Sequence, residues 1–231
     1  MFLPKEYVEP DLETQKQLIR DFPLGTVVTA GGPNGLNANH FPFVIREDPE
    51  KPDTFFLIGH FHKENPAAKD LQAAADSGDE ILIVFQGYNR YCTPSWYPTK
   101  AESHKVAPTW LYSAVHVYGK PKLVNFKEDN ATLHGILKQQ ASTYEESRPK
   151  PWDVDEAPEG YLNILKNMIF GLIIEVTRTE GKWKLNQKQK KVDVQGTADG
   201  LQEEAQERPA SGKMAEDVHE FHEKYLQRLK Y

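Results

Sequence analysis

The sequence contains a single cysteine, no long apolar run and no excess of basic residues. Cys92 cannot form an internal disulfide, and one thiolate is too few for a zinc-finger centre. The longest apolar stretches, such as 81–85 and 170–174, are far shorter than the ~20 residues that a membrane-spanning helix needs, so no membrane partner is expected. An acidic and polar run over 9–17 stands where a signal peptide would be apolar. We therefore expect a cytoplasmic protein, with the nucleus as the alternative.

The chain also lacks the electrostatic signature of a DNA-binding protein. Its formal net charge is −6, from 28 basic and 34 acidic residues, whereas nonspecific DNA affinity comes from neutralising phosphates. Direct DNA binding is therefore disfavoured. Hydrophobic residues make up 39% of the 231 positions, which is enough for a packed core.

We expect one domain over 1–192, followed by a polar tail over 193–231. The tail begins in a segment rich in Gln, Glu, Gly, Ala and Ser, which favours little packed structure. An exposed helix is expected over 215–229, with His219 and His222 facing solvent.

The pattern of apolar and turn-forming residues predicts an α+β fold. Strands are expected near 24–30, 36–45, 54–60, 80–86, 110–119 and 170–177, and helices near 11–20, 66–75, 127–140 and 158–168. A turn at 179–181 is expected to separate the last of these strands from 182–185. Because strands and helices do not alternate regularly, the sequence favours a mostly antiparallel barrel with peripheral helices over a parallel sheet.

The segment 87–108 is expected to be a long functional loop, because it holds three prolines and little periodicity. Half of all Trp and Tyr residues lie between Tyr88 and Tyr118. Such side chains suit stacking on a planar ligand or packing at a subunit interface; the alternative is a loop anchored to the core by its aromatic residues. Cys92 and Ser95 also lie here, but no strand-to-helix nucleophile turn surrounds them, which disfavours a hydrolase.

Several separated motifs occur in the order typical of one family. They are Ser95-Trp96-Tyr97-Pro98, Pro108-Thr109-Trp110, Ala114-Val115-His116, Pro151-Trp152-Asp153-Val154, Asp155-Glu156-Ala157-Pro158 and Glu180-Gly181-Lys182-Trp183-Lys184-Leu185. From Met1 to about Leu201 the chain resembles the PaiB-type family of FMN-binding split-barrel proteins, many of which are labelled negative transcriptional regulators. The chain departs from the family pattern at Leu111-Tyr112 and at 186–188.

The resemblance implies a split β-barrel related to pyridoxamine-phosphate oxidases and flavin reductases. It further implies a homodimer with an FMN site near the subunit boundary. The residues that we expect to bind the cofactor are Asn39, His40, His60, His62, Lys63, Asn65, Ser95, Trp96, Lys100, Trp110, His116, Lys182 and Trp183.

The run Gly59 to Pro66 offers a physical case for a phosphate site. Asn65-Pro66 is a helix-start signal, and a helix N-terminus favours an anion, beside which Lys63 adds a cation. The alternative is an ordinary helix cap with surface histidines. His60 and His62 lack a third ligand within reach, so no metal is expected.

Two further clusters leave their interpretation open. Asn37, Asn39 and His40 could meet the edge of an isoalloxazine ring, or could be purely structural. The basic cluster of five lysines over 182–191, around Trp183, could hold phosphate or nucleic acid or act as a nuclear import signal; a lysine-guarded strand edge is the alternative.

Three functional hypotheses follow. In the first, bound FMN supplies electron chemistry, and any enzyme would be a flavin-dependent oxidoreductase. In the second, the protein is a regulator that acts without catalysis, through flavin or a partner. In the third, the barrel binds heme, with His60 or His116 as an axial ligand.

Overall fold

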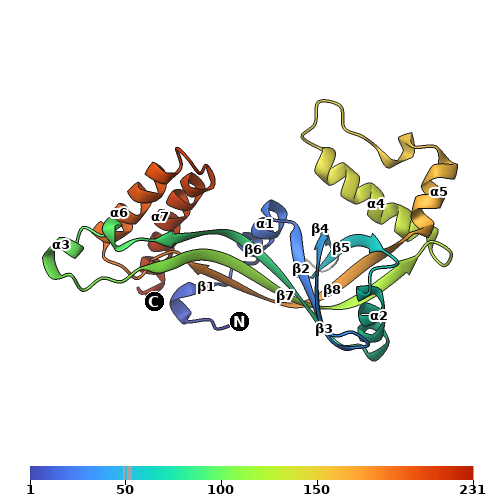
Figure 1. Ribbon diagram of the computed structural model, residues 1–231, viewed down its shortest axis with the longest axis horizontal. Helices are drawn as coiled ribbons and strands as arrows, with labels where there is room; N and C mark the ends of the chain where they lie inside the picture. The colour runs from blue at the N-terminus through green and yellow to red at the C-terminus, as the bar shows by residue number, and fades with distance from the viewer. Residues whose placement is uncertain (49, 51–53, 231) are drawn as a thin grey trace. The chain divides into compact units, whose positions relative to one another are not determined.

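Long strands and flanking helices form most of the chain (Figure 1). A computed structural model describes residues 1–48, 50 and 54–230. The strands are β1 (Val8–Glu9), β2 (Leu24–Gly32), β3 (Gly35–Pro42), β4 (Val44–Glu47), β5 (Phe55–His62), β6 (Ile81–Cys92), β7 (Thr109–Asn125) and β8 (Ile169–Lys184). The α-helices are α1 (Leu12–Asp21), α2 (Ala67–Ser77), α3 (Lys100–Ser103), α4 (Asn130–Glu145), α5 (Glu159–Asn167), α6 (Lys191–Glu204) and α7 (Ala210–Arg228). Three short 3-10 helices are η1 (Lys5–Tyr7), η2 (Pro94–Trp96) and η3 (Val154–Glu156).

The strands form one sheet in the order β3-β2-β6-β7-β8-β5-β4, with β1 paired to β8. The pairs β1–β8, β2–β3, β2–β6, β4–β5 and β5–β8 are all antiparallel. An antiparallel sheet with helices grouped around it confirms the predicted α+β class.

The chain divides into two compact units. Unit 1 comprises residues 1–15, 86–115 and 180–231, and unit 2 comprises residues 16–85 and 116–179. Strands β6, β7 and β8 each contribute residues to both units. The predicted boundary between a domain and a tail at residue 192 stays a prediction.

Unit 2 buries the apolar faces of its strands beneath α4. Leu133 and Ile136 of this helix pack on Val44, Ile58 and Val124 of three strands, and all five side chains are buried. Each buried aliphatic side chain of this kind contributes about 1.5–3 kcal/mol relative to an exposed one. The β2–β3 hairpin turns at Gly31 and Gly35, whose φ angles of +80° and +68° favour glycine.

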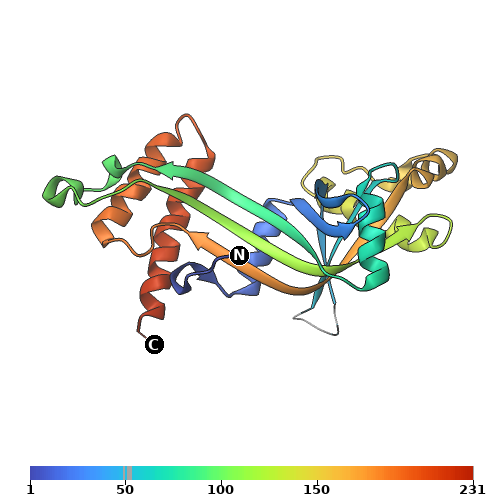
Figure 2. The ribbon, with the colours of Figure 1, turned by 60° about the horizontal axis from the view of Figure 1, so that its bottom comes forward.

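Unit 1 packs α6 and α7 against each other and against its strands (Figure 2). Trp183 of β8 stacks on Phe221 of α7 with ring centroids 5.5 Å apart. Trp96 of η2 lies against α6, where Gly196 and Gly200 leave room for it. One helical turn separates these glycines, so together they form a notch for the tryptophan.

Two strands extend further than the sequence predicts. Residues 87–92 continue β6, so the expected loop is shorter, and it contains η2 and α3. Residues 179–181 do not turn but lie within β8, where Gly181 pairs with Glu9 of β1. The sequence missed these extensions because their residues do not alternate between apolar and polar. Pairing with neighbouring strands keeps them extended.

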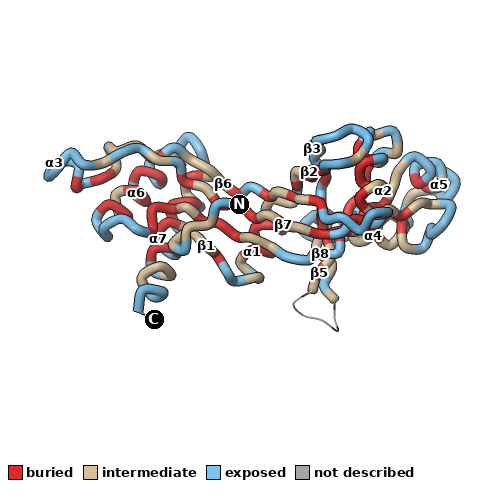
Figure 3. The backbone as a smooth tube through the Cα atoms, turned by 90° about the horizontal axis from the view of Figure 1, so that it is seen from below, coloured by how far each residue is buried: buried red, intermediate tan, exposed pale blue. Residues whose placement is uncertain are grey.

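The C-terminal region is more ordered than the predicted exposed helix. Buried positions recur along both α6 and α7 (Figure 3), including Leu201, Met214 and Val218. His222 is also buried, with 4% of its surface exposed, and its Nδ1 lies 3.0 Å from the carbonyl oxygen of Gln187. The expectation that His222 faces solvent was therefore wrong, whereas His219 is exposed.

None of the helices formed by the described residues is both long and apolar enough to cross a membrane.

Candidate functional site

The turn that leads from β5 into α2 gathers four of the predicted cofactor-binding residues in unit 2. His62, Lys63 and Asn65 lie on the turn, which the amide of Asn65 closes by donating to the carbonyl of His62 at 3.0 Å. Asn39 of β3 joins them, because its Oδ1 accepts from Asn65 Nδ2 at 3.1 Å. As expected for a helix start, Asn65 Oδ1 accepts from an orphan amide, that of Ala67, at 3.0 Å, but α2 begins at Ala67 and its N-cap residue is Pro66.

Lys63 is a half-buried cation without a carboxylate partner. Its Nζ donates to Asn125 Oδ1 at 3.1 Å and lies 5.0 Å from the centre of the Phe170 ring. Within the described part of the chain, no Asp or Glu forms an ion pair with it. An ammonium has three protons to donate, so Lys63 keeps donors and a net charge for an anion.

The free amides predicted at the start of α2 are largely used within the turn. Ala67 donates to Asn65 Oδ1, Ala68 to the carbonyl of Asn65 and Lys69 to that of Pro66. An anion at this turn would therefore depend on Lys63 and the Asn and His side chains more than on helix amides.

Asp70 holds the start of α2 on the β2–β3 hairpin. This buried carboxylate accepts from the amide and side chain of Asn34, from Asn37 Nδ2 at 3.2 Å and from Thr29 Oγ1. Burial alone would raise the pKa of Asp70, but these hydrogen bonds outweigh burial and lower it. Asn37, for which the sequence left open either a contact with an isoalloxazine edge or a purely structural role, is bonded to this carboxylate.

His60 is oriented by α4. Gln140 Nε2 donates to the carbonyl of Pro42 at 3.2 Å, which turns Gln140 Oε1 toward His60 Nδ1 at 2.7 Å. The Nδ1 atom therefore carries the proton in the neutral ring, and Nε2 is left as an acceptor. The sequence gave no signal for Gln140 or Asn125 at this site, because both lie far along the chain from the turn.

The two remaining predicted residues of unit 2 lie on two strands that are not neighbours in the sheet. His40 is exposed on β3 beside Asn39, and His116 is half-buried on β7. No three His, Cys, Asp or Glu side chains among the described residues converge as they would around a metal ion.

The other predicted site residues belong to unit 1, and several of them are engaged in packing. Trp96 fills the notch of α6, Trp183 stacks on Phe221, and Lys182 is buried with its Nζ donating to the carbonyl of Phe2 at 3.0 Å. These contacts are typical of side chains that pack in a protein core. A role for them in cofactor binding stays a prediction.

Three predicted residues of unit 1 are exposed. Ser95 lies within η2, and Lys100 is the first residue of α3. Trp110 is 50% exposed, donates through Nε1 to Asn89 Oδ1 at 3.3 Å and meets Tyr91 edge to face. Of these residues, Trp110 has the free ring surface that stacking on a planar ligand needs.

A hydrogen-bonded network lies behind the aromatic motif in unit 1. Asn186 Nδ2 donates to Tyr97 Oη at 2.9 Å and to Cys92 Sγ at 3.3 Å, and Cys92 Sγ lies 3.1 Å from Tyr97 Oη. Burial raises the pKa of the Cys92 thiol, which keeps the sulfur protonated and unreactive.

The polar groups at the β5–α2 turn fit the phosphate of FMN. A half-buried ammonium without a carboxylate partner among the described residues, on the same turn as Asn65 and its partner Asn39, supplies donors of the kind that a phosphate dianion requires. Lys63, Asn39 and Asn65 are the residues that would hold it.

Comparison with known sequences places most of the chain in one family. Residues 1–178 match the family model described as "Putative FMN-binding domain". An uncharacterized protein of Aspergillus fumigatus is 34% identical over 238 residues, covering 87% of this chain and 91% of the relative. The protease synthase and sporulation protein PAI 2 of Bacillus subtilis is 31% identical over 218 residues, covering 94% of this chain and 95% of the relative.

Solved structures share the fold at low sequence identity. The flavocytochrome Anf3 from Azotobacter vinelandii superposes with a TM-score of 0.50 at 12% identity, covering 79% of this chain and 72% of its own. A conserved hypothetical protein from Mycobacterium tuberculosis superposes with a TM-score of 0.50 at 14% identity. The match covers 79% of this chain and 90% of the other chain. With the antiparallel sheet, the match over residues 1–178 and the 31% identity to PAI 2, the chain belongs to the FMN-binding split-barrel family.

Proposed function

We propose that this protein binds the phosphate of FMN at the β5–α2 turn, through Lys63 and the side-chain amides of Asn39 and Asn65. The observation that carries the proposal is Lys63, a half-buried cation that donates to the neutral amide of Asn125 and has no carboxylate partner among the described residues. A phosphate would supply an anionic partner for Lys63 Nζ, which forms no ion pair with a carboxylate among the described residues.

Paired titrations with FMN and riboflavin test this assignment, because the two ligands differ only in the phosphate. Lys63→Met should weaken FMN binding by about tenfold or more, the cost of one charge-assisted hydrogen bond, and leave riboflavin binding unchanged. Lys63→Glu should weaken FMN binding further through like-charge repulsion. Lys69→Met, on the exposed side of α2, is the matched control. Unchanged FMN affinity in both Lys63 variants would remove Lys63 from the site.

We further infer that the bound flavin serves a flavin-dependent oxidoreductase-type reaction. The flavin supplies the electron chemistry, while the protein supplies binding and orientation. The half-buried His60, with an acceptor Nε2 fixed by Gln140, offers a proton acceptor in the same unit. Oxidation of NADH or NADPH by the FMN-loaded protein, compared with free FMN, tests the inference. A rate no higher than that of free FMN would oppose it.

A flavin-linked regulator is the second candidate, favoured by the 31% identity to a Bacillus protein named for protease synthesis and sporulation. Because the net charge is −6, such a regulator would act through a partner protein more readily than by binding DNA directly. A mobility-shift assay with and without FMN separates these routes. A heme-binding barrel predicts a Soret band in the absorption spectrum of the purified protein, where a flavoprotein shows flavin bands.

We also infer a cytoplasmic homodimer. Helix α5 and its C-cap residue Met168 expose an apolar stripe at the i, i+3, i+4, i+7 spacing. The stripe consists of Tyr161, Ile164, Leu165 and Met168, and Ile164 is 62% exposed. A second copy of the chain would cover this stripe. Sedimentation should then show a dimer for the natural protein and a smaller species for Ile164→Glu; identical sedimentation of the two would oppose this interface.

A further inference from the structure

A second polar pocket lies in unit 2 between α4, η3 and α5, and no residue of the β5–α2 turn lines it. Its volume is ≈ 420 Å³, within the range of about 300–1,000 Å³ typical of small-molecule sites. Asn130 and His134 come from α4, Asp155 from η3, and Glu159 and Lys166 from α5. In Figure 1 these two helices lie next to each other.

Lys166 gives the pocket a buried cation. The side chain is 5% exposed, its Nζ donates to Asn130 Oδ1 at 3.2 Å, and it lies 5.9 Å from the centre of the Phe126 ring. Among residues 1–48, 50 and 54–230, no carboxylate forms an ion pair with Lys166. A buried ammonium is costly unless charged and polar partners compensate it, and this one has further protons to donate.

Two carboxylates, Asp155 and Glu159, also line the pocket. Asp155 is paired with His134 Nε2 at 2.9 Å and with Lys138 Nζ at 2.5 Å, so its charge is largely compensated. Glu159 has no such partner among the described residues. It lies seven positions before Lys166 on α5, on the same face and about 10.5 Å away along the axis.

We propose that this pocket binds a small extended zwitterion, such as an ω-amino acid or a dipeptide. Its carboxylate would accept from Lys166 Nζ and from the side-chain amide of Asn130, and its ammonium would face Glu159. A purely anionic ligand would meet repulsion from Glu159, and a purely cationic one would meet it from Lys166. The two-turn separation of the charges favours an extended ligand over an α-amino acid.

Titration of the full chain with three probes of equal chain length tests the proposal. The probes are 5-aminopentanoate, pentanoate and pentylamine, followed by calorimetry or by chemical shifts of the α5 amides. Saturable binding of 5-aminopentanoate, tighter than that of pentanoate or pentylamine, is expected. Pentanoate binding as tight as 5-aminopentanoate, or no saturable binding of 5-aminopentanoate at millimolar concentrations, would overturn it.

Two variants assign the contacts. Lys166→Met keeps the aliphatic stem and should weaken 5-aminopentanoate binding by about tenfold or more, whereas Lys122→Met, an exposed lysine outside the pocket, should not. Glu159→Gln, at an exposed position that tolerates change, should cost about two- to fivefold and reduce the zwitterion to the affinity of pentanoate. If Lys166→Met does not fold, the titration of Glu159→Gln tests the proposal by itself. An unchanged affinity of this variant for 5-aminopentanoate would refute the proposal.

Discussion

The indole of Trp96 lies so close to Gly200 of α6 that a Cβ atom at position 200 would overlap its Nε1. A Cβ atom at Gly196, one turn earlier, would likewise overlap the carbonyl oxygen of Trp96. The two glycines therefore hold the aromatic motif of η2 against a helix whose sequence alone suggested a loose tail.

Gly200→Ala should lower the free energy of unfolding. The added methyl group would displace the indole, at a cost of about 1–3 kcal/mol, against which alanine returns about 1 kcal/mol in helix propensity. Urea denaturation measures the difference. Gly135→Ala is the matched control, because Gly135 is a helical glycine of α4 with open space around its Cβ position, and it should stabilise. If both substitutions stabilise, Trp96 does not sit against α6.

Asp70→Asn should destabilise the protein by about 1–3 kcal/mol, because the buried carboxylate accepts from Asn34, Asn37 and Thr29. The pKa of Asp70 is lowered from its ordinary 3.8. Its contribution to stability is therefore complete above that pH and lost as the pH falls toward the folded-state value. The natural protein should lose stability below pH 3.8 more steeply than Asp70→Asn. Asp76→Asn, a substitution at an exposed position of the same helix, should leave the loss of stability at acidic pH unaltered.

Cys92 should resist alkylation in the folded protein. Burial raises the pKa of this thiol above its ordinary 9.0, even though hydrogen bonds from Tyr97 and Asn186 act in the opposite direction. Labelling with iodoacetamide at neutral pH should be far slower in buffer than in urea, because both the thiolate fraction and the access are reduced. Cys92 is the only cysteine, so mass spectrometry reads its labelling directly. Equal rates in buffer and urea would show that the site opens readily.

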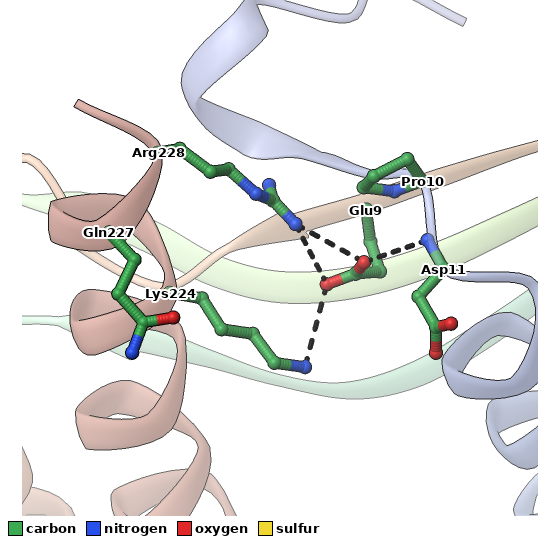
Figure 4. Close-up of a pocket in the computed structure, with 6 residues that line it drawn as sticks. All are labelled: Glu9, Pro10, Asp11, Lys224, Gln227 and Arg228. Carbon is green, nitrogen blue, oxygen red and sulfur yellow. Dashed lines mark hydrogen bonds and ion pairs between the residues drawn. The ribbon is translucent and has the colours of Figure 1, made fainter. Parts of the chain in front are cut away.

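Arg228→Met should destabilise unit 1 by about 1–2 kcal/mol. Glu9 is almost completely buried, and its carboxylate meets Arg228 Nη2 at 3.2 Å and Lys224 Nζ at 3.7 Å, as Figure 4 shows. Removing the guanidinium leaves Glu9 with the more distant lysine, although the partial exposure of Arg228 moderates the cost. A double-mutant cycle with Glu9→Gln measures the coupling. Additive effects of the two substitutions would mean that the pair contributes no stability, and Lys230→Met provides the control for a loss of charge near the C-terminus.

The sequence by itself determined the local elements. Asn65-Pro66 marked the start of α2, Asp11 capped α1 through the amide of Thr14, and the apolar run of 81–85 identified an interior strand of the sheet. The ordered motifs gave the family, which the match over residues 1–178 confirms. These features depend on residues that lie within a few positions of one another, so they can be read from the chain directly.

Only the tertiary structure decided which polar residues are buried and which stand alone. His222, expected to face solvent, and Lys182, expected to bind the cofactor, are both buried in unit 1. Lys63 is half-buried and Lys166 is buried, and neither has a carboxylate partner among the described residues. Burial and charge compensation depend on side chains brought together from distant segments. Asn125 beside Lys63, Gln140 beside His60 and Asn130 beside Lys166 are such partners, and the free energies they contribute arise only once the chain has folded.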